Sequence, residues 1–169
     1  TMQMLSHSRA ASGAEHLIAH LVEMKPRGFE NSHGIHGECV GVGTLICAEE
    51  YHELAKHDDI DVVPFKPLDE KWVRSIFGEL SDGVLDENKD DVLDTFDPSS
   101  IKEHWQDIRQ IISEIPSAKE LKELFTSIGA KYRLEDLGID GLSGRDVLSI
   151  SAAIRNRLTL CRMERLMSI

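Results

Sequence analysis

The chain has 169 residues, 41% of them hydrophobic and 29% charged, which is an ordinary composition for one globular domain. Its formal net charge of −11 argues against nucleic-acid binding, because no basic stripe is available to displace the counterions of a phosphate backbone. No segment approaches the roughly 20 consecutive apolar residues of a membrane span, and the N-terminus lacks a signal-peptide pattern, so no membrane partner is expected.

Cysteine usage indicates the cellular compartment. The three cysteines, Cys39, Cys47 and Cys161, are odd in number and form no CxxC pair. This pattern favours free thiols in a reducing compartment over a disulfide framework. Cys39 and Cys47 lie in an apolar stretch, where they are expected to be small buried hydrophobic residues. We therefore predict a cytoplasmic protein.

Helical patterns dominate the first half of the chain, whereas alternation typical of strands never persists for more than a few residues. Helices are predicted at residues 12–24, 37–56 and 68–80, with at most a short one in the acidic run 82–98. The first should begin with a capping box of Ser12 and Glu15 and end before Pro26. The first half of the helix predicted at 37–56 is apolar on all sides, which predicts that this half is buried.

The second half shows the same kind of pattern. Helices are predicted at residues 98–115, 117–129 and 143–163, with a helical turn in 133–139. Each long helix opens with a capping box: Ser100 with Glu103, Ser117 with Glu120, and Ser143 with Asp146. Four basic residues at helical spacing predict one solvated face on the last helix: Arg155, Arg157, Arg162 and Arg165. We expect one all-α domain over residues 1–169, an irregular multi-helix bundle of about six or seven helices.

Half of the eight histidines fall between His16 and His36. His16 and His20 are four residues apart, so a helix presents both imidazoles on one face. A metalloprotease of the HExxH class is not indicated, because the only adjacent glutamate, Glu15, precedes His16. The spacing by itself leaves metal ligation and a structural role open.

A second histidine pair, His33 and His36, lies in a glycine-rich loop that leads into the apolar helix. A histidine at a helix start is near the positive end of the helix dipole, which disfavours its protonation and favours a neutral, metal-binding imidazole. Gly37, Gly41 and Gly43 leave room for a ligand or for another backbone, and for Gly41 and Gly43 close helix packing is the simpler reading.

Two segments, SRAASGAEHLIAHLVEM (8–24) and HGECVGVGT (36–44), resemble the helical domain of glycerol-1-phosphate dehydrogenases. This family belongs with iron-type alcohol dehydrogenases, glycerol dehydrogenases and dehydroquinate synthases. Residues 113–130, 134–139 and 153–160 extend the resemblance more loosely towards the end of the chain.

The resemblance implies a dehydroquinate synthase-like helical domain that works behind a nucleotide-binding α/β domain. It implies that His16 and His36 are metal ligands together with an upstream aspartate, and that His20 lies near the substrate or its proton path. The implied metal is Zn²⁺, or Fe²⁺ or Ni²⁺, the implied cofactor is NAD(P), and the implied substrate is a phosphorylated polyol such as glycerol-1-phosphate. A zinc site with three protein ligands keeps an open position that can polarise an alcohol.

Two parts of that arrangement have no counterpart here. No strand followed by a glycine-rich turn is present, and no Gly-Asp element precedes His16. Glu15, Glu23 and Glu38 are candidate substitutes for the aspartate, although Glu38 is expected to face solvent or a backbone donor. We therefore expect a C-terminal domain fragment that is inactive as a dehydrogenase without the cofactor domain, and that forms a homo-oligomer through an exposed apolar face.

Two alternatives differ in class. The chain could be a non-catalytic helical interaction module derived from the same family, which docks onto a separate partner. A metal phosphohydrolase of the HD type is suggested by His57-Asp58, but this pair falls in a polar connector and is better explained as a solvated loop.

Overall fold

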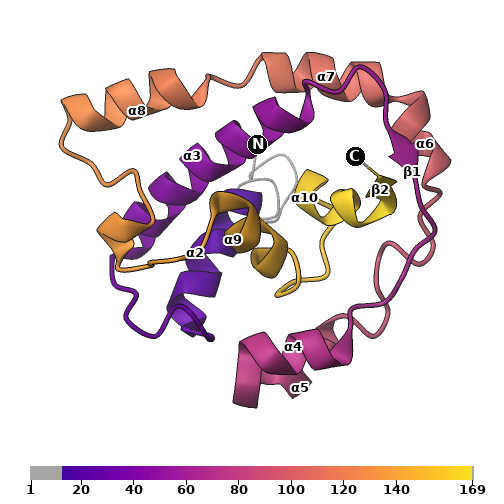
Figure 1. Ribbon diagram of the computed structural model, residues 1–169, viewed down its shortest axis with the longest axis horizontal. Coiled ribbons are helices and arrows are strands. Elements are labelled where there is room, and N and C mark those ends of the chain that lie inside the picture. The colour runs from indigo at the N-terminus through magenta and orange to yellow at the C-terminus, as the bar shows by residue number, and fades with distance from the viewer. Residues whose placement is uncertain (1–12, 169) are drawn as a thin grey trace, which may run out of the picture.

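Helices make up most of the computed structural model, which describes residues 13–168 (Figure 1). In chain order they are α2 (Ala14–Met24), α3 (His36–Leu54), α4 (Glu70–Phe77), α5 (Ser81–Glu87), α6 (Ser99–Glu103), α7 (Trp105–Ser113), α8 (Ala118–Ser127), α9 (Gly144–Ser151) and α10 (Leu160–Met163). Short 3-10 turns lie at Gly78–Leu80, Glu135–Leu137 and Glu164–Leu166. The all-α prediction is confirmed.

Strand pairing in residues 13–168 is limited to two short segments. β1 (Asp61–Val62) pairs antiparallel with β2 (Met167–Ser168), with Val62 opposite Met167. This pairing fixes the end of the chain beside the connector that follows α3. No helix of the described part is long and apolar enough to cross a membrane.

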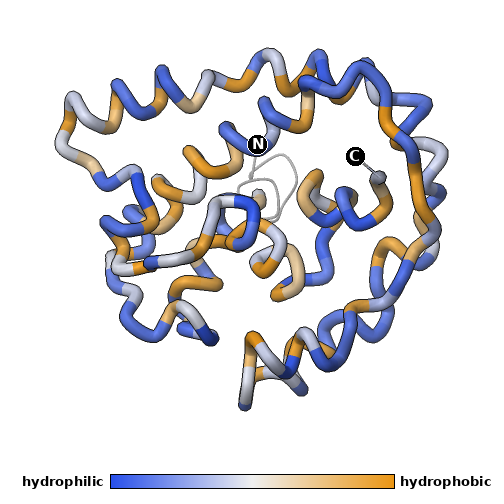
Figure 2. The backbone as a smooth tube through the Cα atoms, viewed as in Figure 1, coloured by the Kyte–Doolittle hydropathy of each residue, from blue (hydrophilic) through white to orange (hydrophobic). Residues whose placement is uncertain are grey.

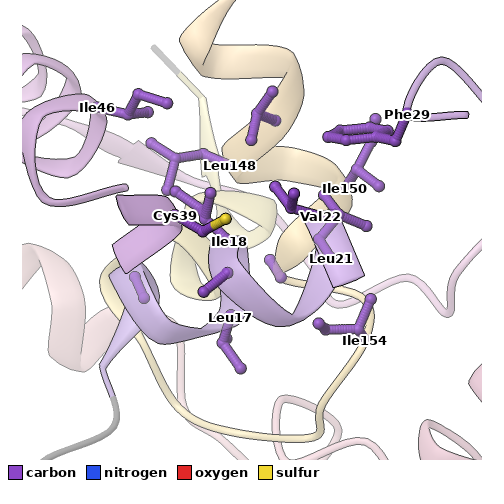
Figure 3. Close-up of a cluster of buried hydrophobic side chains, with 14 of the residues drawn as sticks. Leu17, Ile18, Leu21, Val22, Phe29, Cys39, Ile46, Leu148, Ile150 and Ile154 are labelled. Atoms are coloured by element: carbon purple, nitrogen blue, oxygen red, sulfur yellow. The ribbon is translucent and has the colours of Figure 1, made fainter. Parts of the chain in front are cut away.

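The main core lies between α2, α3 and α9. Leu17, Ile18 and Leu21 of α2 are almost completely buried, and they pack with Cys39 of α3 and Leu148 of α9 (Figure 3). The three cysteines are free and buried, as expected of small hydrophobic residues. The outer helices α7 and α8 instead mix hydrophilic and hydrophobic residues along their length (Figure 2), and only Trp105 and Ile112 of α7 and no residue of α8 are buried.

A second, smaller core fills the space beneath α6 and α7. Trp105 is its largest member, and its indole N–H donates to the carbonyl oxygen of His57 at 2.9 Å. Leu166 and Met167 complete this core, so the chain is part of the folded domain at least as far as these residues.

Glycines allow α2 and α3 to approach each other closely. A Cβ atom on Gly43 would lie 2.8 Å from the backbone oxygen of Glu15 and 3.3 Å from the side chain of Ile18. Gly41 lies on the side of α3 that faces α8, and a Cβ there would be 3.2 Å from the Phe125 ring of α8. A Cβ on Gly37 would meet nothing within 4 Å. Close helix packing is therefore the correct explanation for Gly41 and Gly43.

The capping boxes at Ser117 and Ser143 are both present, and the helical turn predicted in 133–139 is confirmed. Ser12 lies outside the described residues, and Gly13 is the residue that precedes α2. The box predicted at Ser100 is wrong, because the Asp97 carboxylate instead accepts the Ser99 backbone N–H at 3.0 Å. The helix predicted over 98–115 is also interrupted, at His104.

The long helix predicted over 143–163 is wrong as well. α9 ends at Ser151, and α10 begins only after Thr159, whose hydroxyl caps it. Between them the Asn156 side chain accepts the backbone N–H of Val92 at 2.8 Å and donates to the carbonyl oxygen of Asp90 at 2.7 Å. These contacts with the acidic run come from tertiary packing, which helix periodicity cannot report.

A solvated basic face on the last helix is contradicted by Arg162, which is completely buried. Its guanidinium pairs with Asp91 at 2.8 Å and donates to the carbonyl oxygens of Ala152 and Arg155 at 2.7 and 2.9 Å. Burial raises the pKa of Asp91, but the Leu93 backbone N–H, Arg165 and Arg162 outweigh it and hold that pKa below its usual range. The network joins α10 to the segment that follows α5.

We predict that Gly43→Ala lowers the free energy of unfolding by about 1–3 kcal/mol, because the atom opposite is backbone and cannot move aside cheaply. Gly37→Ala is the matched control, since its Cβ meets open space and it should cost nothing or stabilise the helix by up to about 1 kcal/mol. Urea denaturation followed by circular dichroism measures both. Equal stability of the two variants would contradict the packing argument.

We also predict that Arg162→Ala destabilises the domain by about 3–5 kcal/mol, because it removes one of the two guanidinium groups that pair with the buried Asp91 carboxylate and leaves the carbonyl oxygens of Ala152 and Arg155 without their donor. Arg155→Ala is the control, since Arg155 is half-exposed and its nitrogen lies 3.9 Å from the Glu87 carboxylate, a contact worth at most about 1 kcal/mol. Thermal denaturation of both variants tests the claim, and a similar small loss in each would refute it.

Candidate metal centre

Three histidines meet where α2 packs against the start of α3. α2 presents His16 and His20 on one face and ends at Met24, and the next residue, Lys25, takes a left-handed conformation (φ 49°) before Pro26. The following loop returns the chain so that His36 is the first residue of α3, at the helix start that the sequence predicted. The ring centroid of His36 lies 5.3 Å from that of His16 and 5.5 Å from that of His20, and the ring centroids of His16 and His20 are 6.5 Å apart.

Each of these rings turns its Nδ1 atom towards a carboxylate. His36 Nδ1 lies 2.7 Å from Glu23 Oε1, and His20 Nδ1 lies 3.0 Å from Glu23 Oε2. His16 Nδ1 faces Glu15 instead, at 3.3 Å. One carboxylate therefore links a histidine of α2 to the histidine that begins α3.

The electrostatics of the cluster favour cation binding. Hydrogen bonds from His36 and then from His20 lower the pKa of Glu23, so its carboxylate is ionised at neutral pH. The side chains of His20 and His36 are each 44% exposed and that of Glu23 is 47% exposed, so an ion can reach them from solvent.

The donor set suits a divalent transition metal. His20, Glu23 and His36 each offer one ligand atom, and these three atoms lie within 4.8 Å of one another. This is the one such group of His, Cys, Asp or Glu side chains in residues 13–168. Imidazole nitrogen and carboxylate oxygen are ligands that zinc, nickel and iron accept. His16 falls outside this group, although its ring lies beside His36.

Other candidates from the sequence lie apart from this centre. His33 is exposed, with its Nδ1 3.4 Å from the carbonyl oxygen of Asn31. Glu38 accepts the backbone N–H of Ile35 at 3.0 Å and pairs with Lys131 at 2.9 Å, so the expectation of a backbone donor is confirmed.

The pair His57-Asp58 also lies away from the histidine cluster. Both residues are exposed in the connector that follows α3, and Asp58 forms an ion pair with Arg109 at 3.0 Å. The solvated-loop explanation is therefore confirmed for this pair.

The sequence of the chain is similar to those of several known enzymes. The chain is 26% identical over 159 residues, 94% of its length, to the glycerol-1-phosphate dehydrogenase [NAD(P)+] of Halalkalibacterium halodurans. It is 35% identical over 82 residues, 48% of its length, to the enzyme of the same name from Bacillus velezensis. Over 52 residues, 30% of the chain, it is 42% identical to that of Methanococcus maripaludis.

The chain is related to the glycerol-1-phosphate dehydrogenases. It spans only 33% of the Halalkalibacterium enzyme, 20% of the Bacillus velezensis enzyme and 16% of the Methanococcus enzyme. No protein-family model matches the chain, and no solved structure matches it at a significant level.

Proposed function

We propose that this chain is the metal- and substrate-binding helical domain of an NAD(P)-dependent dehydrogenase that acts on glycerol-1-phosphate or a similar polyol phosphate. The observation that carries the proposal is the meeting of His16, His20 and His36, with ring centroids 5.3–6.5 Å apart, in a relative of enzymes with that name. Within residues 13–168, the one group of three or more His, Cys, Asp or Glu side chains placed to hold a metal ion also lies here, and it consists of His20, Glu23 and His36.

In this proposal His16 and His36 hold the ion, and His20 lies beside the substrate or its proton path. A bound divalent ion supplies Lewis-acid polarisation of the substrate alcohol. Glu15 and Glu23, which face the Nδ1 atoms of the histidines, keep the rings oriented.

The nicotinamide cofactor would be bound by a nucleotide-binding domain that docks beside the histidines. Ile35, directly before His36, is 73% exposed and gives that side of the centre an apolar contact. Because this proposal assigns the cofactor to that domain, we expect the chain to be inactive as a dehydrogenase without it.

A second candidate function is a non-catalytic interaction module. It is favoured by exposed apolar side chains on α7, on α8 and just after α8: Ile111 is 64%, Leu124 55% and Ile128 69% exposed. The same side chains would serve a homo-oligomer. This candidate makes no use of the histidine cluster, so metal binding distinguishes it from the dehydrogenase domain.

The dehydrogenase proposal predicts NAD(P)H formation only in a complete enzyme. The purified chain with zinc, glycerol-1-phosphate and NAD(P)⁺ should give no signal at 340 nm. A chimera in which it replaces the matched third of the Halalkalibacterium enzyme should turn over, and His36→Ala should abolish that turnover. A folded chimera that binds NAD(P) but does not turn over, or turnover by the chain alone, would contradict the proposal.

A further inference from the structure

We propose that a cavity between α3, α8 and the segment 132–144 binds a small monoanion with an apolar body, of the class of medium-chain carboxylates. The cavity has a volume of about 510 Å³, within the range of roughly 300–1,000 Å³ that small-molecule sites occupy. Leu45, which lines it, comes about two and a half turns after His36 on α3, a rise of about 13 Å. The site is therefore separate from the histidine cluster and does not depend on the proposed function.

The buried residues that line the cavity are all apolar. Leu45 and Ile46 of α3 are each 7% exposed, and Leu134 is 9% exposed. On the opposite side α8 contributes the small side chain of Ala118, and no residue of α8 is buried. Protein side chains therefore leave apolar surface uncovered between the two helices. An apolar group that entered the cavity would remove this surface from water, which favours binding.

The charged side chains that line the cavity are all exposed, and they define which charge a ligand can carry. Lys119, Lys122 and Arg133 are basic, whereas Glu49 and Glu135 are acidic. The opening is therefore positive overall, although the chain has a net charge of −11. This balance attracts one anionic group, and the two glutamates oppose a second negative charge. A carboxylate fits it better than a phosphate dianion.

Lys122 is the basic residue best placed to meet that anionic group. Its Nζ atom lies 5.4 Å from the centroid of the Tyr132 ring, and it forms no ion pair with a carboxylate of residues 13–168. Arg133 lies 5.5 Å from the same centroid, but its guanidinium pairs with Asp136 at 2.8 Å. The Asp136 carboxylate also accepts the backbone N–H groups of Tyr132 and Arg133, at 3.2 and 3.1 Å. The turn that carries the ring is therefore fixed before a ligand binds, which lowers the entropic cost of binding.

The test is an NMR titration of the purified chain with octanoate, with octyltrimethylammonium as a cation of the same chain length. We expect one equivalent of octanoate to bind, with an affinity that rises about fourfold for each methylene from butanoate to octanoate. The cation should bind at least about fivefold more weakly. The largest amide shifts should fall in residues 45–49, 118–122 and 132–144. Octanoate should also raise the unfolding temperature, because it binds the folded chain alone.

Four variants test the assignment. Lys122→Met keeps the length of the side chain but removes its charge, so octanoate should bind about fivefold more weakly and lose its advantage over the cation. Ala118→Phe fills the cavity and should abolish binding of both. Lys71→Met makes the same charge change on α4, away from the cavity, and His36→Ala alters the histidine cluster. Both of these controls should bind octanoate as the unsubstituted chain does. Circular dichroism verifies that each variant is folded, and Lys122→Met decides the matter if Ala118→Phe is not.

Several results would overturn the inference. Equal affinity for octanoate and for the cation, or an affinity for octanoate that is unchanged in Lys122→Met, would show that no specific anion site exists. Amide shifts centred on another apolar surface, such as that around Ile111, would place the ligand elsewhere. Loss of octanoate binding in His36→Ala would place the carboxylate at the histidine cluster, and absence of binding would leave the cavity without this role.

Discussion

The close approach of α2 to α3 is the constraint on which the rest of the structure depends. Gly43 has no side chain, so the α3 backbone can lie against the Glu15 carbonyl, where a Cβ would be only 2.8 Å away. This contact brings the histidines of α2 beside the first residue of α3, and it buries Leu17, Ile18 and Leu21 between α3 and α9. Core packing and the candidate site are therefore two consequences of one helix pair: one face of α2 makes the core, and another presents His16, His20 and Glu23.

The remainder of the domain holds this pair from outside. α9 covers α2, and the buried Asp91–Arg162 pair joins α10 to the segment after α5, while the β1–β2 pairing fixes the last residues. None of these elements contributes a donor to the histidine cluster. The histidine cluster is therefore backed by α2 and α9, and it is open to solvent on the side of Ile35, which is 73% exposed.

Most helices could be predicted because their signals are local. The capping boxes at Ser117 and Ser143 and the Lys25-Pro26 stop act within a few residues of the chain. The long terminal helix and the solvated face at Arg162 could not be predicted correctly, because Asn156 and Arg162 find their partners in the acidic run more than 60 residues away. At the site, helix spacing placed His16 and His20 on one face, the helix start at His36 marked that residue as a metal-binding candidate, and the resemblance then paired His36 with His16. Which of Glu15, Glu23 and Glu38 lies between two rings depends on how the loop after Pro26 returns, and only the structure shows that it is Glu23.

The central claim is that this cluster is a metal centre, and anomalous diffraction at the zinc edge tests it most directly. Crystals of the chain grown with one equivalent of Zn²⁺ should give one strong peak within the histidine cluster, at about 2.0–2.2 Å from ring nitrogens of His16 and His36. A peak elsewhere, for instance along the acidic run 82–97, or no ordered zinc at all, would contradict the account. The histidines would then be explained by the packing of α2 on α3 alone.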